Sequence, residues 1–192
     1  MKKKSAAGGG CGARAEGHFD TLTALQYQIS CSVIYTIIMT ILKGIPRVLP
    51  PSLLHILAKM GHGDTLVIAD ANFPAASVAA CTAGGLVNCD GSDAPTVLRA
   101  ITKLLPLDPT CSPVAFMALM PEHAAAGWKT PIKAEYKKIA EEAEGREIVC
   151  TEIERFAFYE AAKKAYAVVS TGETAFYANV ILTKGIIGES GK

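Results

Sequence analysis

The chain has 192 residues, half of them apolar and 19% charged, and its formal net charge is +1. This composition is typical of a globular protein of one domain, and the lack of a basic stripe argues against a nucleic-acid partner. Six cysteines are scattered without CxxC or metal-ligand spacing. That usage favours free thiols in a reducing compartment, the cytoplasm, with neither disulfides nor structural zinc.

Residues 1–38 differ from the remainder and are predicted to be a disordered or dispensable extension. The stretch "MKKKSAAGGGCGARAEG" is basic and then rich in glycine and alanine, a composition typical of disorder. Residues 21–42 carry no charge, but they reach the roughly 20 residues of a membrane span only by including polar Thr and Gln. A signal peptide is also disfavoured, because the apolar part begins late and lacks a clear cleavage site. We therefore place the domain at 39–192, with Met39 as an alternative start and a membrane anchor as the minor alternative.

From Met39 onward, helix-like and strand-like segments alternate. Pro50 and Pro51 open a helix with a broad apolar face, and Gly61 stands where a helix C-terminal glycine belongs. In chain order, the later predicted elements are a strand at 65–69, a helix capped by Ser92 or Asp93 and ended by Pro106, a strand at 112–120, a helix from Thr130-Pro131 to Gly145, a strand at 147–153, a helix at 155–164, and strands at 166–169 and 180–183. This interleaving argues for an α/β layered domain whose sheet is largely buried.

Polar residues flank the predicted strand at 65–69 on both sides. His62 lies between two glycines, which leave its backbone free and its ring unshielded on a loop. An imidazole in that setting can transfer protons near neutral pH. Asp70 follows the strand, at the edge where open α/β sheets place ligands, although a turn-forming aspartate that caps local amides fits equally well. The remaining histidines are interpreted as structural: His18, His55 and His123.

The segment "ERFAFYEAAKKAYA" offers two more candidate groups. Arg155 and Tyr159 are four residues apart and share one helix face. Alternatively, Tyr159 belongs to the core with its hydroxyl at the surface, and Arg155 pairs only with a neighbouring glutamate. Phe156 and Phe158 are predicted to be core residues.

The segment "STGETAFYANVIL" places Tyr177 and Asn179 two residues apart, hence on the same side of an extended chain. Their hydroxyl and amide groups are donors and acceptors of the kind that hold a sugar. The sequence has no nucleophile elbow, no metalloprotease motif and no phosphate-binding or dinucleotide-binding glycine loop. The candidate residues, without a metal or a cofactor, suit proton transfer on a neutral polar molecule.

Four stretches, "LKGIPRVLPPSLLHILAKMGHGDTLVIADANFP", "LLPLD", "ERFAFYEAAKKA" and "TGETAFYANVILTKG", together resemble the family of L-fucose mutarotases and D-ribose pyranases. The resemblance covers roughly residues 40–187. It implies a three-layer α/β/α domain with a mixed sheet, ring-shaped homo-oligomers such as a decamer, and cofactor-free interconversion of the α and β anomers of L-fucose. The "RFAFYE" segment favours the fucose branch over the ribose branch.

The resemblance also implies roles for particular residues. It makes His62 and Tyr159 the two proton-transfer groups. The positions that it implies for substrate binding are Asp70, Asp108, Arg155, Tyr177 and Asn179. One departure lies at Asn88–Gly91, which reads "NCDG" where relatives often read "RADG". The chain therefore lacks an arginine at this loop, and if that arginine helps subunit packing or substrate contact in relatives, the affinity of this chain is expected to differ.

The spacing of His62 and Asp70 has a geometric consequence. Eight residues at ~3.3 Å each would separate them by roughly 26 Å if the segment is extended. A single monosaccharide cannot bridge that distance within one subunit. Either the segment bends sharply or the pocket takes His62 from one subunit and the other residues from a neighbour, and we favour the shared pocket. Two alternatives in function stay open, a mutarotase for another sugar such as D-ribose and a non-catalytic sugar-binding oligomer.

Overall fold

The computed structural model describes residues 41–188. The predictions made for residues 1–38 and for Met39 as a start lie outside these residues. Among the helices of the described part, none has the length and apolar character needed to cross a membrane.

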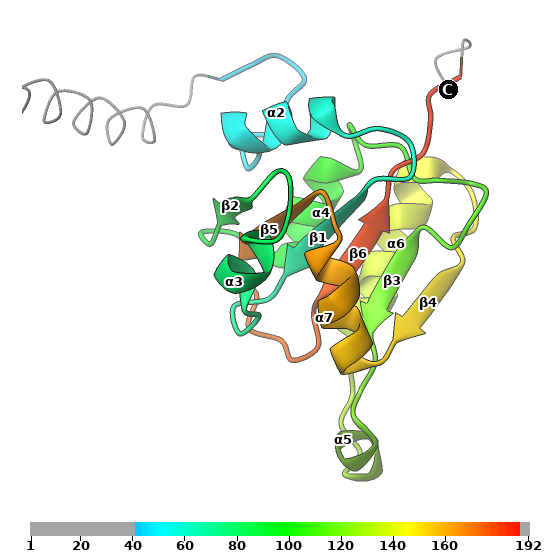
Figure 1. Cartoon of the computed structure of the whole chain (residues 1–192). Coiled ribbons are helices and arrows are strands. Elements are labelled where there is room, and N and C mark those ends of the chain that lie inside the picture. Colours follow the sequence, from blue (N-terminus) through cyan, green and yellow to red (C-terminus); the bar gives the residue numbers. More distant parts are fainter. Residues whose placement is uncertain (1–40, 189–192) are drawn as a thin grey trace, which may run out of the picture. The chain divides into compact units, whose positions relative to one another are not determined.

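The described residues form one six-stranded sheet with helices on both faces (Figure 1). The strands are β1 (Thr65–Ala69), β2 (Leu86–Cys89), β3 (Val114–Met117), β4 (Cys150–Ile153), β5 (Ala167–Thr171) and β6 (Val180–Thr183). The helices are α2 (Pro51–Lys59), α3 (Ala75–Ala79), α4 (Ala94–Ile101), α5 (Pro121–Ala125), α6 (Ile132–Glu144) and α7 (Arg155–Lys163). The spatial order of the strands is β2-β5-β1-β6-β3-β4.

The sheet is mixed, as the resemblance implies. β1 pairs in parallel with β5, β5 with β2, and β3 with β4, whereas β6 pairs antiparallel with both β1 and β3. Five strands therefore share one direction, and their carboxyl ends lie at the same edge of the sheet. The start of β6 lies at that edge too. This edge is called the C-terminal edge below, and the opposite one the N-terminal edge.

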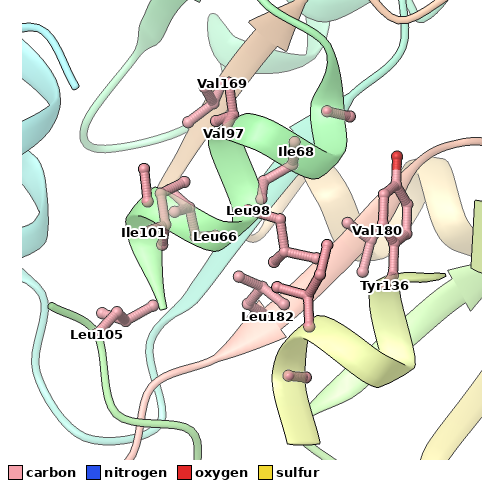
Figure 2. Packing of buried hydrophobic residues seen from close by; sticks show 14 of the residues in the cluster. Leu66, Ile68, Val97, Leu98, Ile101, Leu105, Tyr136, Val169, Val180 and Leu182 are labelled. Carbon is pink, nitrogen blue, oxygen red and sulfur yellow. The ribbon is translucent and has the colours of Figure 1, made fainter. Parts of the chain in front are cut away.

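Successive side chains of β1 point to opposite faces of the sheet, and each face packs against its own apolar cluster. Leu66 and Ile68 belong to the apolar cluster under α2, α4 and α6, and Figure 2 shows them beside Leu98 of α4. Val67 and Ala69 belong to the opposite cluster, under α3 and α7. Figure 1 shows α7 in front of the sheet and α4 and α6 behind it. The predicted three-layer α/β/α architecture is confirmed.

Several local predictions are confirmed at the residue level. β1 and β6 have the predicted bounds. The Asp93 side chain caps α4 by accepting a hydrogen bond from the Thr96 amide at 2.7 Å, which satisfies one of the helix's free N–H groups. Gly145 ends α6 in the left-handed conformation, with φ +64°, which a residue without Cβ adopts without strain.

Other predictions are wrong. α2 ends at Met60 in extended backbone, and the left-handed turn falls on Gly63 (φ +82°) rather than on Gly61. α4 ends at Ile101, before the predicted stop at Pro106. Phe156 is 64% exposed instead of buried, because the inward face of α7 carries Phe158. The short elements α3, β2 and α5, of four or five residues each, were not predicted.

Candidate functional site

A cavity of about 250 Å³ lies at the C-terminal edge of the sheet and contains five of the seven predicted site residues. These are Asp70, Arg155, Tyr159, Tyr177 and Asn179. Asp70 follows β1, the arginine and the first tyrosine lie on α7 after β4, and the last two residues precede β6. Three segments far apart in the sequence meet here because their strands end or begin at one edge. The predicted ligand edge thus carries a real cavity.

Asp70 and Asn179 form the buried floor of this cavity. The Asp70 amide donates to Asn179 Oδ1 at 2.9 Å, and Asn179 Nδ2 donates to Asp70 Oδ2 at 2.7 Å. Asp70 Oδ1 also accepts from the Asn72 amide at 3.0 Å. Burial raises the pKa of the Asp70 carboxyl above its ordinary value, and these hydrogen bonds oppose that rise. Asp70 is therefore both the turn-capping residue and a cavity residue, so its two interpretations are compatible.

Tyr159 is oriented from two sides. Arg155 Nε donates to the Tyr159 hydroxyl at 3.2 Å, and the Phe73 ring lies 5.5 Å from the Tyr159 ring between centroids. Because the hydroxyl oxygen accepts from the guanidinium, its own proton is free for an acceptor in the cavity. The alternative pairing of Arg155 with Glu152 or Glu160 is wrong, because these carboxylates accept from Lys133 at 2.9 Å and from Lys163 at 2.6 Å.

Tyr177 adopts the left-handed conformation, with φ 59°. A bulky residue in this region is an outlier that costs free energy and is commonly found at functional sites. The extended backbone expected here begins only at β6, yet Tyr177 and Asn179 both line the cavity. The Tyr177 hydroxyl lies 2.6 Å from His123 Nδ1 and 3.5 Å from the Met120 amide nitrogen.

The cavity has further lining residues that the sequence did not reveal. They are Asn72, Phe73, Met117, His123, Trp128 and Phe176. His123, which the sequence presented as a structural histidine, contacts a predicted site residue and lines the cavity. One signal was available: Trp128 is the single tryptophan of the chain and follows a glycine in a polar loop, where the fold does not require it.

His62 and Asp108 lie together at the N-terminal edge, away from the lining of this cavity. His62 Nε2 is 3.0 Å from Asp108 Oδ2, with the side chains 52% and 7% exposed. Hydrogen bonds from the Thr110 amide and hydroxyl, and then the contact with His62, hold the pKa of Asp108 below its ordinary value. An ionised Asp108 accepts a hydrogen bond from Nε2–H of His62, which leaves Nδ1 of the neutral imidazole as the ring's acceptor.

The loop that carries His62 is fixed by β6 and the residues after it. The Gly63 amide donates to the Lys184 carbonyl at 2.9 Å, and Lys184 Nζ donates to the Met60 carbonyl at the end of α2. Gly185 packs on the backbone of Asp108, where an added Cβ would lie 2.9 Å from the Asp108 Cα. The dyad of His62 and Asp108 therefore sits on a rigid support.

Within one chain, the structure does not bring His62 and Tyr159 together. They lie beyond opposite ends of β1, whose five residues span about 16 Å at the usual rise. The regular strand excludes the sharp bend between His62 and Asp70. The shared pocket remains a prediction.

The fold and the cavity define a mixed-sheet α/β protein with a small polar pocket at the carboxyl ends of its strands. The chain belongs to the RbsD / FucU transport protein family, whose model matches residues 43–187. Among its relatives, "Fucose mutarotase" of Danio rerio is 52% identical over 150 residues, which is 78% of this chain and 96% of the relative. "Fucose mutarotase" of Homo sapiens is 50% identical over 151 residues, again 78% and 96%.

A solved structure supports the same assignment to the family. The fucose mutarotase of Streptococcus pneumoniae, crystallised in complex with L-fucose, has 42% sequence identity with this chain and a TM-score of 0.68. The similarity covers 77% of this chain and 100% of the solved one. The similarity to these proteins thus extends over nearly the whole described domain.

Proposed function

We propose that this protein is an isomerase that interconverts the α and β anomers of L-fucose by opening and reclosing the sugar ring. The observation that carries the proposal is the cavity in which Tyr159, Asp70 and Asn179 converge. The proposal is supported by the similarity to two fucose mutarotases, which covers 96% of the length of each. A cavity of about 250 Å³ suits one monosaccharide, and its polar groups match the hydroxyls of a neutral ligand.

The reaction needs one base and one acid. The base removes the proton of the anomeric hydroxyl while the acid protonates the ring oxygen, and the bond between that oxygen and the anomeric carbon breaks to leave an aldehyde. The aldehyde carbon rotates, and the hydroxyl attacks its other face with the proton roles reversed. Tyr159 is suited to the acid role, because the guanidinium of Arg155 directs its proton into the cavity.

The buried pair of Asp70 and Asn179 would bind the sugar hydroxyls. Asp70 can accept hydrogen bonds from two hydroxyls, whereas the Asn179 amide is held in place by Asp70 itself. A fixed set of partners reduces the orientations open to the sugar and so raises the probability of proton transfer. Tyr177 and Arg155 complete the polar wall.

His62 would enter this cavity from a neighbouring subunit of a homo-oligomer, a ring such as a decamer. A half-exposed imidazole whose tautomer is set by Asp108 is suited to proton transfer, but within residues 41–188 of its own chain it does not line the cavity. Asp108 would then orient His62 rather than touch the sugar. Large exposed apolar side chains support subunit packing: Leu86, Val149, Phe156, Ile186 and Ile187.

We place the enzyme in the cytoplasm. The four cysteines of the described residues are all free thiols, which suits a reducing compartment. The substrate in this proposal is a free monosaccharide, and no nucleic acid or membrane takes part.

Exchange NMR between the two anomers of L-fucose tests the function. Purified protein is expected to accelerate exchange in proportion to its concentration, whereas the Tyr159→Phe variant is expected to leave it near the spontaneous rate. D-Ribose measured in parallel decides between the fucose mutarotase and a mutarotase for another sugar. Binding of L-fucose without any acceleration would instead establish a non-catalytic sugar-binding protein and overturn the proposal.

A further inference from the structure

One side of the cavity is lined by aromatic side chains. The rings of His123 and Trp128 stack with their centroids 4.2 Å apart and their planes 6° from parallel. The ring of Phe176 lies 5.1 Å from that of Trp128. Trp128 is 39% exposed and Phe176 is 61% exposed, although both line the cavity. Exposed apolar surface in a ligand cavity indicates contact with an apolar part of the ligand.

This aromatic wall, the side chains of His123, Trp128 and Phe176, is tied to the polar part of the cavity. His123 Nδ1 lies 2.6 Å from the Tyr177 hydroxyl, and the two rings meet edge to face at 79°. His123 begins the wall on the short helix α5, which Figure 1 shows beyond the end of β3. Trp128 follows three residues after this helix ends. The stack on His123 therefore fixes the position of Trp128 relative to the floor formed by Asp70 and Asn179.

The cavity thus offers hydrogen-bonding groups on one side and aromatic carbon on the other. A 6-deoxyhexopyranose of the galacto configuration has the same division, with hydroxyl groups on one side and a patch of C–H bonds beside its methyl carbon on the other. We propose that Trp128, held by His123, determines the preference of this cavity for a 6-deoxy sugar by contacting the methyl group beside that carbon patch. This inference rests on the proposed function and names the part of the substrate that the aromatic wall recognises.

The matched pair of substrates is L-fucose and D-arabinose, since the D-arabinopyranose ring has the configuration of L-fucose and lacks only the methyl group. Anomer exchange is measured for both sugars with the full chain and with Trp128→Leu. The variant is expected to lose about tenfold in kcat/KM on L-fucose, mostly through KM, and no more than about twofold on D-arabinose. Trp128→Phe keeps an aromatic face and is expected to retain the preference.

Two variants of His123 separate the stack from the hydrogen bond. His123→Phe keeps a ring against Trp128 but loses the contact with the Tyr177 hydroxyl, and is expected to keep the preference for L-fucose. His123→Asn keeps a polar group near Tyr177 but loses the stack, and is expected to lose the preference as Trp128→Leu does. A larger loss of preference in His123→Phe than in His123→Asn would contradict the role of the stack.

Saturation-transfer NMR supplies a readout that is independent of turnover. In the unmodified protein, the methyl protons of bound L-fucose are expected to receive more saturation than the anomeric proton, and Trp128→Leu is expected to remove that difference. An unchanged ratio of kcat/KM for the two sugars, together with unchanged methyl saturation in Trp128→Leu, would overturn the inference while leaving the mutarotase function intact. Absence of exchange with either sugar in the unmodified protein would refute the mutarotase function itself.

Discussion

Asp70 and Asn179 hold each other through two hydrogen bonds that run in opposite directions, at 2.9 and 2.7 Å, across 109 residues of sequence. Both residues are buried, with exposed fractions of 5% and 4%. The pair joins the end of β1 to the start of β6, two neighbouring strands of opposite direction. The two hydrogen bonds therefore fix the orientation of both side chains at the floor of the cavity, and they also connect β1 to β6.

The pair is expected to contribute to stability as well as to binding. Asn179→Ala leaves the Asp70 amide and one carboxylate oxygen without partners in a buried site, which is expected to lower the free energy of unfolding by about 1–3 kcal/mol. Urea unfolding measures the change. Asn72→Ala is the matched control, because the exposed Asn72 side chain makes no hydrogen bond to any of residues 41–188, and its expected change is below about 0.5 kcal/mol. Equal losses in the two variants would show that the Asp70–Asn179 pair is not stabilising.

Two aspartates are expected to give opposite dependences of stability on pH. The folded-state pKa of Asp70 is raised, chiefly by burial, so its contribution is fully present below its unfolded pKa near 4 and is lost as the pH rises through the folded value. The folded-state pKa of Asp108 is lowered, chiefly by Thr110, so its contribution is present above pH ~4 and is lost as the pH falls below it.

Unfolding free energies of Asp70→Asn and Asp108→Asn, each compared with the unmodified protein between about pH 3 and pH 7, measure these contributions. The advantage of the unmodified protein over Asp70→Asn should shrink as the pH rises, and its advantage over Asp108→Asn should grow. Slopes of the same sign for both variants would show that one of the two assigned shifts is wrong.

The hydroxyl of Tyr159 is expected to be essential for catalysis. Tyr159→Phe removes the proposed acid and is expected to lower the rate of enzymatic anomer exchange by about 10²–10⁴, the usual contribution of a general acid. The unfolding free energy should change little, because the ring and its contact with Phe73 remain. Tyr166→Phe deletes a hydroxyl outside the cavity and should leave the rate unchanged. Comparable exchange rates in the two variants would remove Tyr159 from the mechanism.

Gly185 is expected to be needed for the position of Asp108. A Cβ at residue 185 would lie 2.9 Å from the Asp108 Cα and amide nitrogen, closer than real Cβ contacts allow, whereas a Cβ on Gly188 would meet nothing within 4 Å. Gly185→Ala should therefore displace Asp108, disturb His62 and reduce anomer exchange, and Gly188→Ala should behave as the unmodified protein. Chemical shifts of the His62 ring nitrogens report the displacement directly, and unaltered shifts with full activity would contradict the prediction.

Much of the fold could be predicted because local patterns determine it. β1 and β6 are short β-branched apolar runs between polar residues, and their bounds followed from that pattern. β2 was missed because it has four residues and alternates exposed and buried positions at the edge of the sheet. The rule that open α/β sheets bind ligands at the carboxyl ends of their strands predicted the position of Asp70 beside the cavity.

The site could be predicted only in part, because some of its contacts join residues without any local pattern. His123 reaches Tyr177 across 54 residues, and His62 reaches Asp108 across 46. His123 carries no flanking glycines and lies on a short helix, so nothing near it in sequence distinguishes it from a structural histidine. Tyr177 was predicted from its spacing of two residues from Asn179, on the assumption that the chain is extended there. Its backbone is left-handed instead.

The central claim is that each active site combines Tyr159 of one subunit with His62 of another. Complementation between two inactive variants, His62→Ala and Tyr159→Phe, measures it most directly. The two proteins are unfolded and refolded together, and anomer exchange of L-fucose is compared with that of each variant treated alone. If subunits mix at random, about a quarter of the sites receive both intact groups, so the mixture should regain about a quarter of the unmodified activity. A mixture that forms mixed oligomers yet stays as inactive as either variant would contradict the claim.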